Sequence, residues 1–323
     1  MRKNTSAIAA ALAAVALLVS GCSSAAPGGG GGEEESKGAI AFSFPTQDVN
    51  IWKQQLDLLQ PRIEEAGYTF LTDNPSFDLQ TQVNDWTTWV QRGDVKAIMG
   101  FPVQADAMVP VTAQATAANI PVLGYAGAWE GVTAQLILDT VDAGSQVGEA
   151  AGEWIKENAG GEQVRVAILA DTTADLGRSQ KEGIEKGLEA SGADVVIDDL
   201  EASSRDDGYK AAQTQLVAHP DTTVWLGIGA DMVLGARQAV IDSGVAANDP
   251  SYYVSATDGD DEAFGLIASG DDMWRTAFVW TPESLVDAEF EMLIAAAEGR
   301  EVEDVTLGVT EVNADNAASL ISK

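Results

Sequence analysis

Few of the residue types that carry out covalent chemistry occur in this chain of 323 residues. It has one histidine, His219, and one cysteine, Cys22, so it offers no cysteine- or histidine-based metal cluster and no intramolecular disulfide. No G-x-S-x-G turn occurs, and no G-x-G-x-x-G lies between a predicted strand and a helix. His219 precedes a predicted strand, away from the strand ends where reactive groups gather in α/β proteins. We therefore predict that the protein is not an enzyme and holds no cofactor or metal.

An acidic run at 258–262 offers carboxylates, which are the ligands that calcium prefers. The run lacks the glycine at the sixth position and the distant glutamate of an EF-hand loop, so its spacing does not favour calcium. We interpret most of the other acidic residues as a solvated shell, which favours solubility and is compatible with life in salt.

The charge balance excludes one large class of functions. Fifty acidic residues against eighteen basic residues give a formal net charge of −32. A protein that neutralises nucleic-acid phosphates needs clustered lysine and arginine, so we predict no nucleic-acid partner. Like charges also disfavour adsorption of the folded body to an anionic membrane.

The first residues have the anatomy of an export signal. Arg2 and Lys3 precede a thirteen-residue apolar stretch at 7–19, which is too short for a comfortable transmembrane helix. Residues 18–22, Leu-Val-Ser-Gly-Cys, resemble the bacterial lipobox, which implies cleavage after residue 21 and a lipid on Cys22. An ordinary cleaved signal with an incidental cysteine is the alternative. Loss of residues 1–21 removes two basic residues and no acidic ones, which leaves a charge near −34.

The segment that follows, 22–37, is predicted to be a flexible tether. It contains five consecutive glycines and then three glutamates, and nothing in it can bury apolar area. A lipidated, tethered body would be held at the outer surface of the cell membrane yet move above it.

From residue 39 onward, short apolar runs alternate with helical patterns of ten to sixteen residues. Residues 39–44 read as a strand, and apolar residues between Trp52 and Ile63 recur at helical spacing. Pro61 falls inside that helix and is expected to kink it or end its first half. The same rhythm continues to a last core strand at 275–279 and a long helix at 282–297. This order predicts an α/β protein of two doubly wound, parallel-sheet lobes, with ligands bound beyond the carboxyl ends of the strands.

Several segments, in this order and spacing, resemble periplasmic sugar-binding proteins of the ribose-binding type, the soluble receptors of ABC importers. The resemblance covers about residues 38–323 and rests on five motifs: Ala-Asn-Ile-Pro-Val at 118–122, Val-Asp-Ala-Gly at 141–144, the helix start at 178–184, one βα turn formed by 219–225 and 231–236, and Thr-Asp-Gly at 257–259. It implies a type I periplasmic binding protein fold whose chain crosses between lobes three times through a three-stranded hinge. The implied lobes are 38–141 with 282–307, and 142–281 with 308–323.

The resemblance also implies a binding site, because a sugar offers hydroxyls to polar side chains and C–H faces to aromatic rings. Asp258 matches the family's hydroxyl acceptor, although it could simply cap the next helix, and Arg178 matches a sugar-binding arginine, although it could be a surface helix start. The other predicted ligand-binding residues follow strand ends or a lobe crossing, with packing in the core or exposure in a loop as the alternative for each: Asp48, Asn50, Trp52, Phe101, Gln104, Tyr125 and Trp280.

The chain departs from the ribose-type pattern at two positions. Ala126-Gly127 stands where the family commonly has Asp-Arg, and Gly229-Ala230-Asp231 stands where it has Asn-Asp. These losses favour a sugar or polyol other than ribose, with Tyr125 or Trp129 filling the space.

The predicted function is therefore a monomeric, lipid-anchored, extracytoplasmic receptor that captures a sugar or sugar-like polyol in an interlobe cleft. It would deliver this ligand to the permease subunits of an ABC importer. A receptor for chemotaxis or for a sensor kinase is the alternative, since the same closed form would serve both roles. The export signal and the absence of a basic helix-turn-helix segment exclude a DNA-binding repressor.

Overall fold

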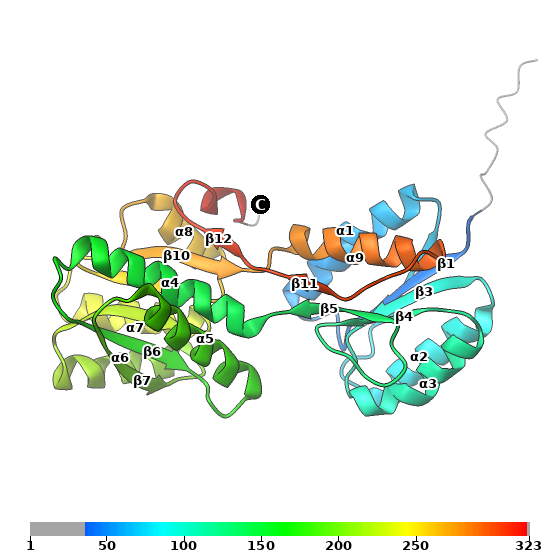
Figure 1. Ribbon diagram of the computed structural model, residues 1–323, viewed down its shortest axis with the longest axis horizontal. Coiled ribbons are helices and arrows are strands. Elements are labelled where there is room, and N and C mark those ends of the chain that lie inside the picture. The colour runs from blue at the N-terminus through cyan, green and yellow to red at the C-terminus, as the bar shows by residue number, and fades with distance from the viewer. Residues whose placement is uncertain (1–35, 322–323) are drawn as a thin grey trace, which may run out of the picture. The chain divides into compact units, whose positions relative to one another are not determined.

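A computed structural model describes residues 36–321 (Figure 1). The predicted signal peptide, the lipidation site at Cys22 and most of the predicted tether lie outside these described residues.

The first sheet has six strands, all parallel, in the order β11-β5-β4-β3-β1-β2. Its strands are β1 (Ala39–Ser43), β2 (Thr69–Thr72), β3 (Val95–Gly100), β4 (Val122–Tyr125), β5 (Ala134–Leu138) and β11 (Val305–Leu307). Four helices pack on it: α1 (Asn50–Glu65), α2 (Leu79–Arg92), α3 (Ala105–Ala117) and α9 (Pro282–Ala297). We call this layered unit the N-terminal lobe.

The second sheet also has six strands, in the order β12-β10-β9-β8-β6-β7, and only β12 runs antiparallel to its neighbour. Its strands are β6 (Val164–Ala170), β7 (Val195–Glu201), β8 (Thr222–Gly227), β9 (Tyr253–Ala256), β10 (Trp274–Val279) and β12 (Thr310–Val312). The helices of this C-terminal lobe are α4 (Thr140–Asn158), α5 (Asp175–Ser191), α6 (Arg205–Ala218), α7 (Ala230–Asp242) and α8 (Asp261–Ser269), and a 3-10 turn η1 (Ala317–Ser319) follows.

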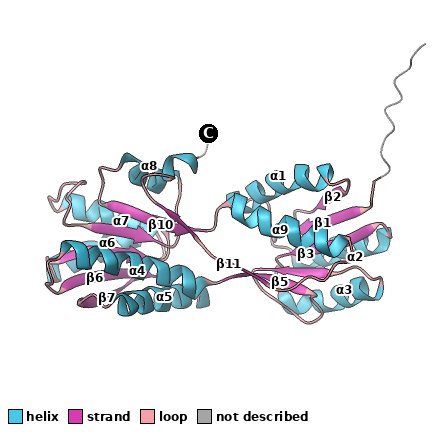
Figure 2. Cartoon of the chain, turned by 45° about the horizontal axis from the view of Figure 1, so that its top comes forward, coloured by secondary structure: helices cyan, strands magenta, loops and turns pink. Residues whose placement is uncertain are grey.

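The chain passes between the two sheets three times. It leaves the first sheet after β5 and enters α4, returns from β10 into α9, and crosses again between β11 and β12. These crossings run side by side in both views (Figures 1 and 2). The fold is therefore two α/β lobes, as the sequence pattern predicted, joined by three strand-like connections, as the family resemblance implied.

Each sheet is covered on both faces, which explains why inner strands such as β1 and β4 are buried at every position. In the N-terminal lobe, α1 and α9 bury one face of the sheet, and α2 and α3 bury the other (Figure 2). In the C-terminal lobe, side chains of α4 and α5 form the core on one face, and those of α6, α7 and α8 form it on the other.

Glycines set the distance between α4 and α5. A Cβ atom at Gly148 would lie 2.1 Å from the carbonyl oxygen of Ile184, and one at Gly187 would lie 2.0 Å from that of Ser145. The two helix backbones therefore touch directly, and a larger residue on this face would force them apart.

The structure departs from the sequence-based expectations in two ways. Strand β5 and the short crossing strands β11 and β12 were not expected. Pro61 lies within one continuous helix, so the expected break is wrong. Proline removes the hydrogen bond to the carbonyl of Asp57, but both residues lie on the exposed face, where water can serve that carbonyl.

Candidate ligand-binding site

Aromatic rings gather where the strands of the first sheet end. The Trp52 ring, in the first turn of α1, stacks on Phe44 at 5.3 Å between centroids and 4° between planes. It meets the edge of Phe101 at 5.7 Å and the tilted ring of Phe77 at 6.4 Å. The Tyr125 ring packs edge-on against Phe44, with 5.1 Å between the ring centroids. We call these five residues the aromatic cluster.

The residues of the aromatic cluster range from fully buried to exposed. Tyr125 is 3% exposed and belongs to the core of the N-terminal lobe, and Phe44 is fully buried. Trp52 and Phe101 are half-buried, while Phe77 is 59% exposed. Of the three aromatic residues predicted here from sequence, Trp52 and Phe101 are thus partly exposed to solvent. Tyr125 is buried in the core, where its ring packs against Phe101.

A pocket of about 750 Å³ lies beside the crossing from β10 to α9. It brings together three of the predicted site residues, Asn50 from the start of α1, Asp258 from the loop after β9, and Trp280 from the crossing itself. We call it the crossing pocket. Residues of both lobes line it, which is the position that a ligand clamped by two lobes requires.

The carboxyl group of Asp258 has a perturbed pKa. Its side chain reaches solvent, yet the protein around it raises the pKa of its carboxyl, chiefly because burial disfavours the charged form. The backbone N–H of Gly259 donates to Oδ1 at 2.8 Å and opposes this rise, whereas the charges of Asp260 and Asp231 add to it. The N-cap of α8 is Asp260 and not Asp258, so the capping alternative for Asp258 is wrong.

Trp280 links two of the crossings. Its indole Nε1–H donates to the carbonyl oxygen of Leu307 at 2.9 Å, which ties the end of β10 to the end of β11. Thr281 then caps α9 by accepting from the N–H of Ser284. The ring of Trp280 is half-buried and faces the crossing pocket.

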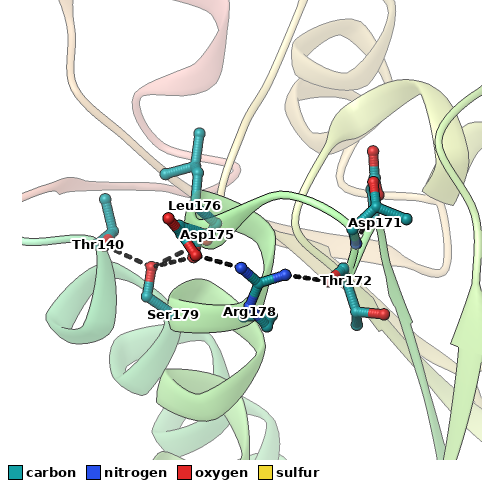
Figure 3. A network of polar contacts seen from close by, with 8 residues as sticks. Thr140, Asp171, Thr172, Asp175, Leu176, Arg178 and Ser179 are labelled. Atoms are coloured by element: carbon teal, nitrogen blue, oxygen red, sulfur yellow. Dashed lines mark hydrogen bonds and ion pairs between the residues drawn. The ribbon is translucent and has the colours of Figure 1, made fainter.

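Arg178 lies in the first turn of α5 (Figure 3), and the lining of the crossing pocket does not include it. Its guanidinium pairs with the carboxylate of Asp175 and donates to the carbonyl oxygen of Thr172. Its side chain is 50% exposed. Beside it, the hydroxyls of Thr140 and Ser179 lie 3.0 Å apart and join α4 to α5. Two of the five N–H donors of Arg178 thus bind residues of its own loop and first turn.

The two remaining predicted site residues lie on exposed loops. The backbone N–H of Asp48 donates to the hydroxyl of Thr46, and Gln104 is the N-terminal cap position of α3 without a side-chain capping bond. The structure therefore divides the nine predicted residues into the crossing pocket, the aromatic cluster, Arg178 on α5, and these two.

Sequence reasoning missed a polar network at the same edge of the first sheet. Ser43, at the end of β1, donates to Oδ2 of Asp73 at 3.1 Å and accepts from the amide of Gln82 at 2.9 Å. That amide also donates to the carbonyl of Phe101, and its oxygen accepts from the N–H of Val103. Burial raises the pKa of Asp73 to about 7. Asp73, a polar residue directly after β2, is the feature of the sequence that could have indicated this network.

The described residues contain no group of histidine, cysteine, aspartate or glutamate side chains that could hold a metal ion. Within 36–321 no helix is both long and apolar enough to cross a membrane.

Two α/β lobes, three crossings and a pocket beside them define a two-lobe binding protein. The chain belongs to the family described as periplasmic binding protein domain, whose model matches residues 40–301. This membership agrees with the prediction that the protein binds a ligand and is not an enzyme.

Relatives of known sequence and structure agree with this assignment. The ribose import binding protein of Escherichia coli strain K12 is 27% identical over 217 residues, which cover 65% of this chain and 70% of that protein. An ABC transporter solute binding protein from Mycobacterium smegmatis, solved with glycerol, has a TM-score of 0.66 at 23% identity and covers 89% of this chain and 98% of its own. A periplasmic ribose ABC transporter protein from Conexibacter woesei has a TM-score of 0.72 at 17% identity, with coverage of 90% and 96%.

Proposed function

We propose that this protein captures a sugar or sugar-like polyol between its lobes and delivers it to an ABC import permease. The observation that carries the proposal is the meeting of Asp258, Asn50 and Trp280 in one pocket beside the lobe crossings. The matching relatives include a ribose import binding protein and a solute binding protein solved with glycerol, which supports the same ligand class.

The side chains suit a hydroxyl-rich, uncharged guest. The carboxylate of Asp258 accepts hydrogen bonds from hydroxyl groups, and the amide of Asn50 both donates and accepts. The faces of Trp52 and Phe101 pack against C–H surfaces of a sugar ring. The ribose-type pattern has polar side chains at the positions of Ala126 and Gly229, and this chain has none there. The proposed ligand is therefore not ribose itself.

We further propose that the mature protein is a monomer held at the outer face of the cell membrane by a lipid on Cys22. Its tether leaves the lobes free to reach a permease. A receptor that serves chemotaxis or a sensor kinase is the alternative. Loss of uptake on deletion of the gene, with unchanged taxis and signalling, would favour import over that alternative.

The test of ligand capture is calorimetry and thermal shift against a panel of monosaccharides and polyols. A ligand at one hundred times its Kd should stabilise the protein by about 2.7 kcal/mol. Asp258→Asn should weaken binding about ten- to a hundredfold, because it removes a charged hydrogen-bond acceptor, and Trp52→Ala and Arg178→Ala should also weaken it. Glu157→Gln, an exposed change at the end of α4, is the matched control. Absence of binding by the whole panel would reject the proposal.

Anchoring has a separate test. The wild-type protein should partition into the membrane fraction of the producing cells and take up a labelled fatty acid. Cys22→Ser should abolish the label and release the protein. A soluble, unlabelled wild-type protein would contradict the anchor and leave ligand capture untouched.

A further inference from the structure

The loop between β2 and α2 holds an aromatic ring in solvent. Phe77 is 59% exposed, and no other aromatic residue appears among the exposed large apolar side chains of residues 36–321. Burying a phenylalanine side chain stabilises a protein, so leaving one exposed forgoes that gain.

The backbone around this ring is strained. Ser76 and Phe77 both adopt left-handed conformations, with φ of 52° and 61°. Such conformations are unfavourable for residues with a Cβ atom and persist only where the surrounding structure fixes them, often at ligand sites.

The surrounding structure does fix this loop, because it is fastened to the loop that follows β1. The N–H of Phe77 donates to the carbonyl of Pro45 at 2.7 Å, and the amide of Gln47 donates to the carbonyl of Asp73 at 2.8 Å. At the far end, Asp78 caps α2 by accepting from the N–H of Thr81 at 2.7 Å. The exposed ring is thus held in place and is not a free loop tip.

The ring also continues the aromatic cluster outward. Trp52 lies between Phe77 at 6.4 Å and Phe101 at 5.7 Å, so one ring from the first turn of α1 and two rings from loops lie at one edge of the sheet. The neighbouring positions Ala126 and Gly127, after β4, add no polar side chain to this edge.

We propose that Phe77 is a ligand-contacting residue that favours sugars with an apolar end, such as 6-deoxy sugars, over their fully hydroxylated parents. A methyl group packs on an aromatic ring without losing a hydrogen bond, whereas a hydroxymethyl group placed there loses contact with water. This inference rests on the proposed function, because it assumes that the ligand is a sugar bound at the aromatic cluster.

The experiment compares matched sugars by calorimetry: L-fucose with L-galactose, L-rhamnose with L-mannose, and 6-deoxy-D-glucose with D-glucose. In at least one pair the wild-type protein should bind the deoxy sugar more tightly. Phe77→Ala should weaken that binding about three- to tenfold and leave the parent sugar within about twofold. Phe77→Leu, which keeps an apolar side chain, should lie between the two. Val217→Ala, an exposed apolar change on α6 with 87% exposure, is the control.

The outcomes separate the two proposals. If Trp52→Ala and Asp258→Asn weaken sugar binding while Phe77→Ala does not, the role of Phe77 is overturned and the proposed function stands. Unchanged sugar binding with slower uptake in cells would also overturn it, because the ring would then contact the permease. If the wild-type protein binds no sugar of the panel, both proposals fail. Equal melting temperatures of the variants without ligand exclude a folding defect as the cause.

Discussion

Glu289 on α9 is a carboxyl group placed in the core of the N-terminal lobe. It is fully buried, and neither carboxyl oxygen has a hydrogen-bond partner among the described residues. Burial raises its pKa to about 8, and the positive charge of Arg62 opposes this rise. The nearby phenol of Tyr125 also has a raised pKa, from burial and from the charge of Glu289. At neutral pH the protonated form of Glu289 is therefore the one that fits this site.

This shift makes stability depend on pH. The unfolded chain releases the proton of Glu289 near pH 4.5, whereas the folded chain keeps it until about pH 8. The contribution of this group is therefore fully present below the unfolded pKa and is lost as the pH rises to the folded pKa, with a slope of up to about 1.4 kcal/mol per pH unit. Urea unfolding at pH 5.5 and 8.5 should show a larger loss of stability in the wild-type protein than in Glu289→Gln. The exposed Glu291→Gln on the same helix should behave as wild type. Equal losses in all three proteins would contradict the prediction.

Asp258 gives a second pH dependence, this time in binding. A hydroxyl group donates to the ionised carboxylate, so ligand binding requires the deprotonated form. Because the pKa of Asp258 is raised, acidification should weaken binding from a higher pH than it would for an aspartate with the ordinary pKa. Calorimetric titrations between pH 4 and 7 should show this loss. Asp258→Asn should bind weakly at every pH with no such dependence, and a wild-type affinity that is constant over the range would refute the assignment.

At the scale of helices, the glycines of α4 and α5 permit direct backbone packing in the C-terminal lobe. Gly148→Ala places a Cβ atom against the carbonyl of Ile184, so we expect a loss of about 1–3 kcal/mol despite the better helix propensity of alanine. Gly265 in α8 is the matched control, since nothing lies within 4 Å of the position that an alanine Cβ atom would take there, and Gly265→Ala should stabilise the protein by up to about 1 kcal/mol. Thermal unfolding measures both changes. A Gly148→Ala protein as stable as wild type would show that the helices can separate freely.

The sequence pattern predicted most elements because long periodic segments coincide with covered faces of the sheets. Helix α9 was expected at 282–297, where the structure has it. Strands β11 and β12 have three residues each, which is too short for any periodicity, and they are defined by the crossings they form. The gathering of Asp258 and Trp280 follows from their places after strand ends. The left-handed backbone at Ser76 and Phe77 has no such signal, because neither residue is glycine, so the exposed ring could not be predicted.

At the scale of the whole molecule, charge is the dominant feature. The formal net charge of −32 places many acidic side chains on the surface, and self-repulsion of this kind destabilises the compact state. On α4, three exposed glutamates, Glu149, Glu153 and Glu157, follow one another at four-residue spacing. Like charges at this spacing disfavour the helix by about 0.2–0.5 kcal/mol for each pair.

Salt should therefore stabilise this protein. Raising the ionic strength from 0.01 to 1 M shortens the screening length from about 30 to about 3 Å, which removes most repulsion between exposed carboxylates. We expect the melting temperature to rise with sodium chloride, by about 2–4 °C for each kcal/mol of repulsion removed. Changing all three glutamates of α4 to glutamine should raise the melting temperature in low salt and reduce the response to salt.

The control changes three acidic residues that have basic partners, Asp57, Asp206 and Asp287, to asparagine. It alters the net charge by the same amount but also removes three exposed ion pairs, each worth up to about 1 kcal/mol. Its melting temperature in low salt should therefore rise less than that of the α4 variant. If the melting temperatures of the two variants rise equally, repulsion acts through the total charge and not through the three neighbouring glutamates of α4. If salt leaves the wild-type melting temperature unchanged, the acidic surface does not limit the stability of the fold at all.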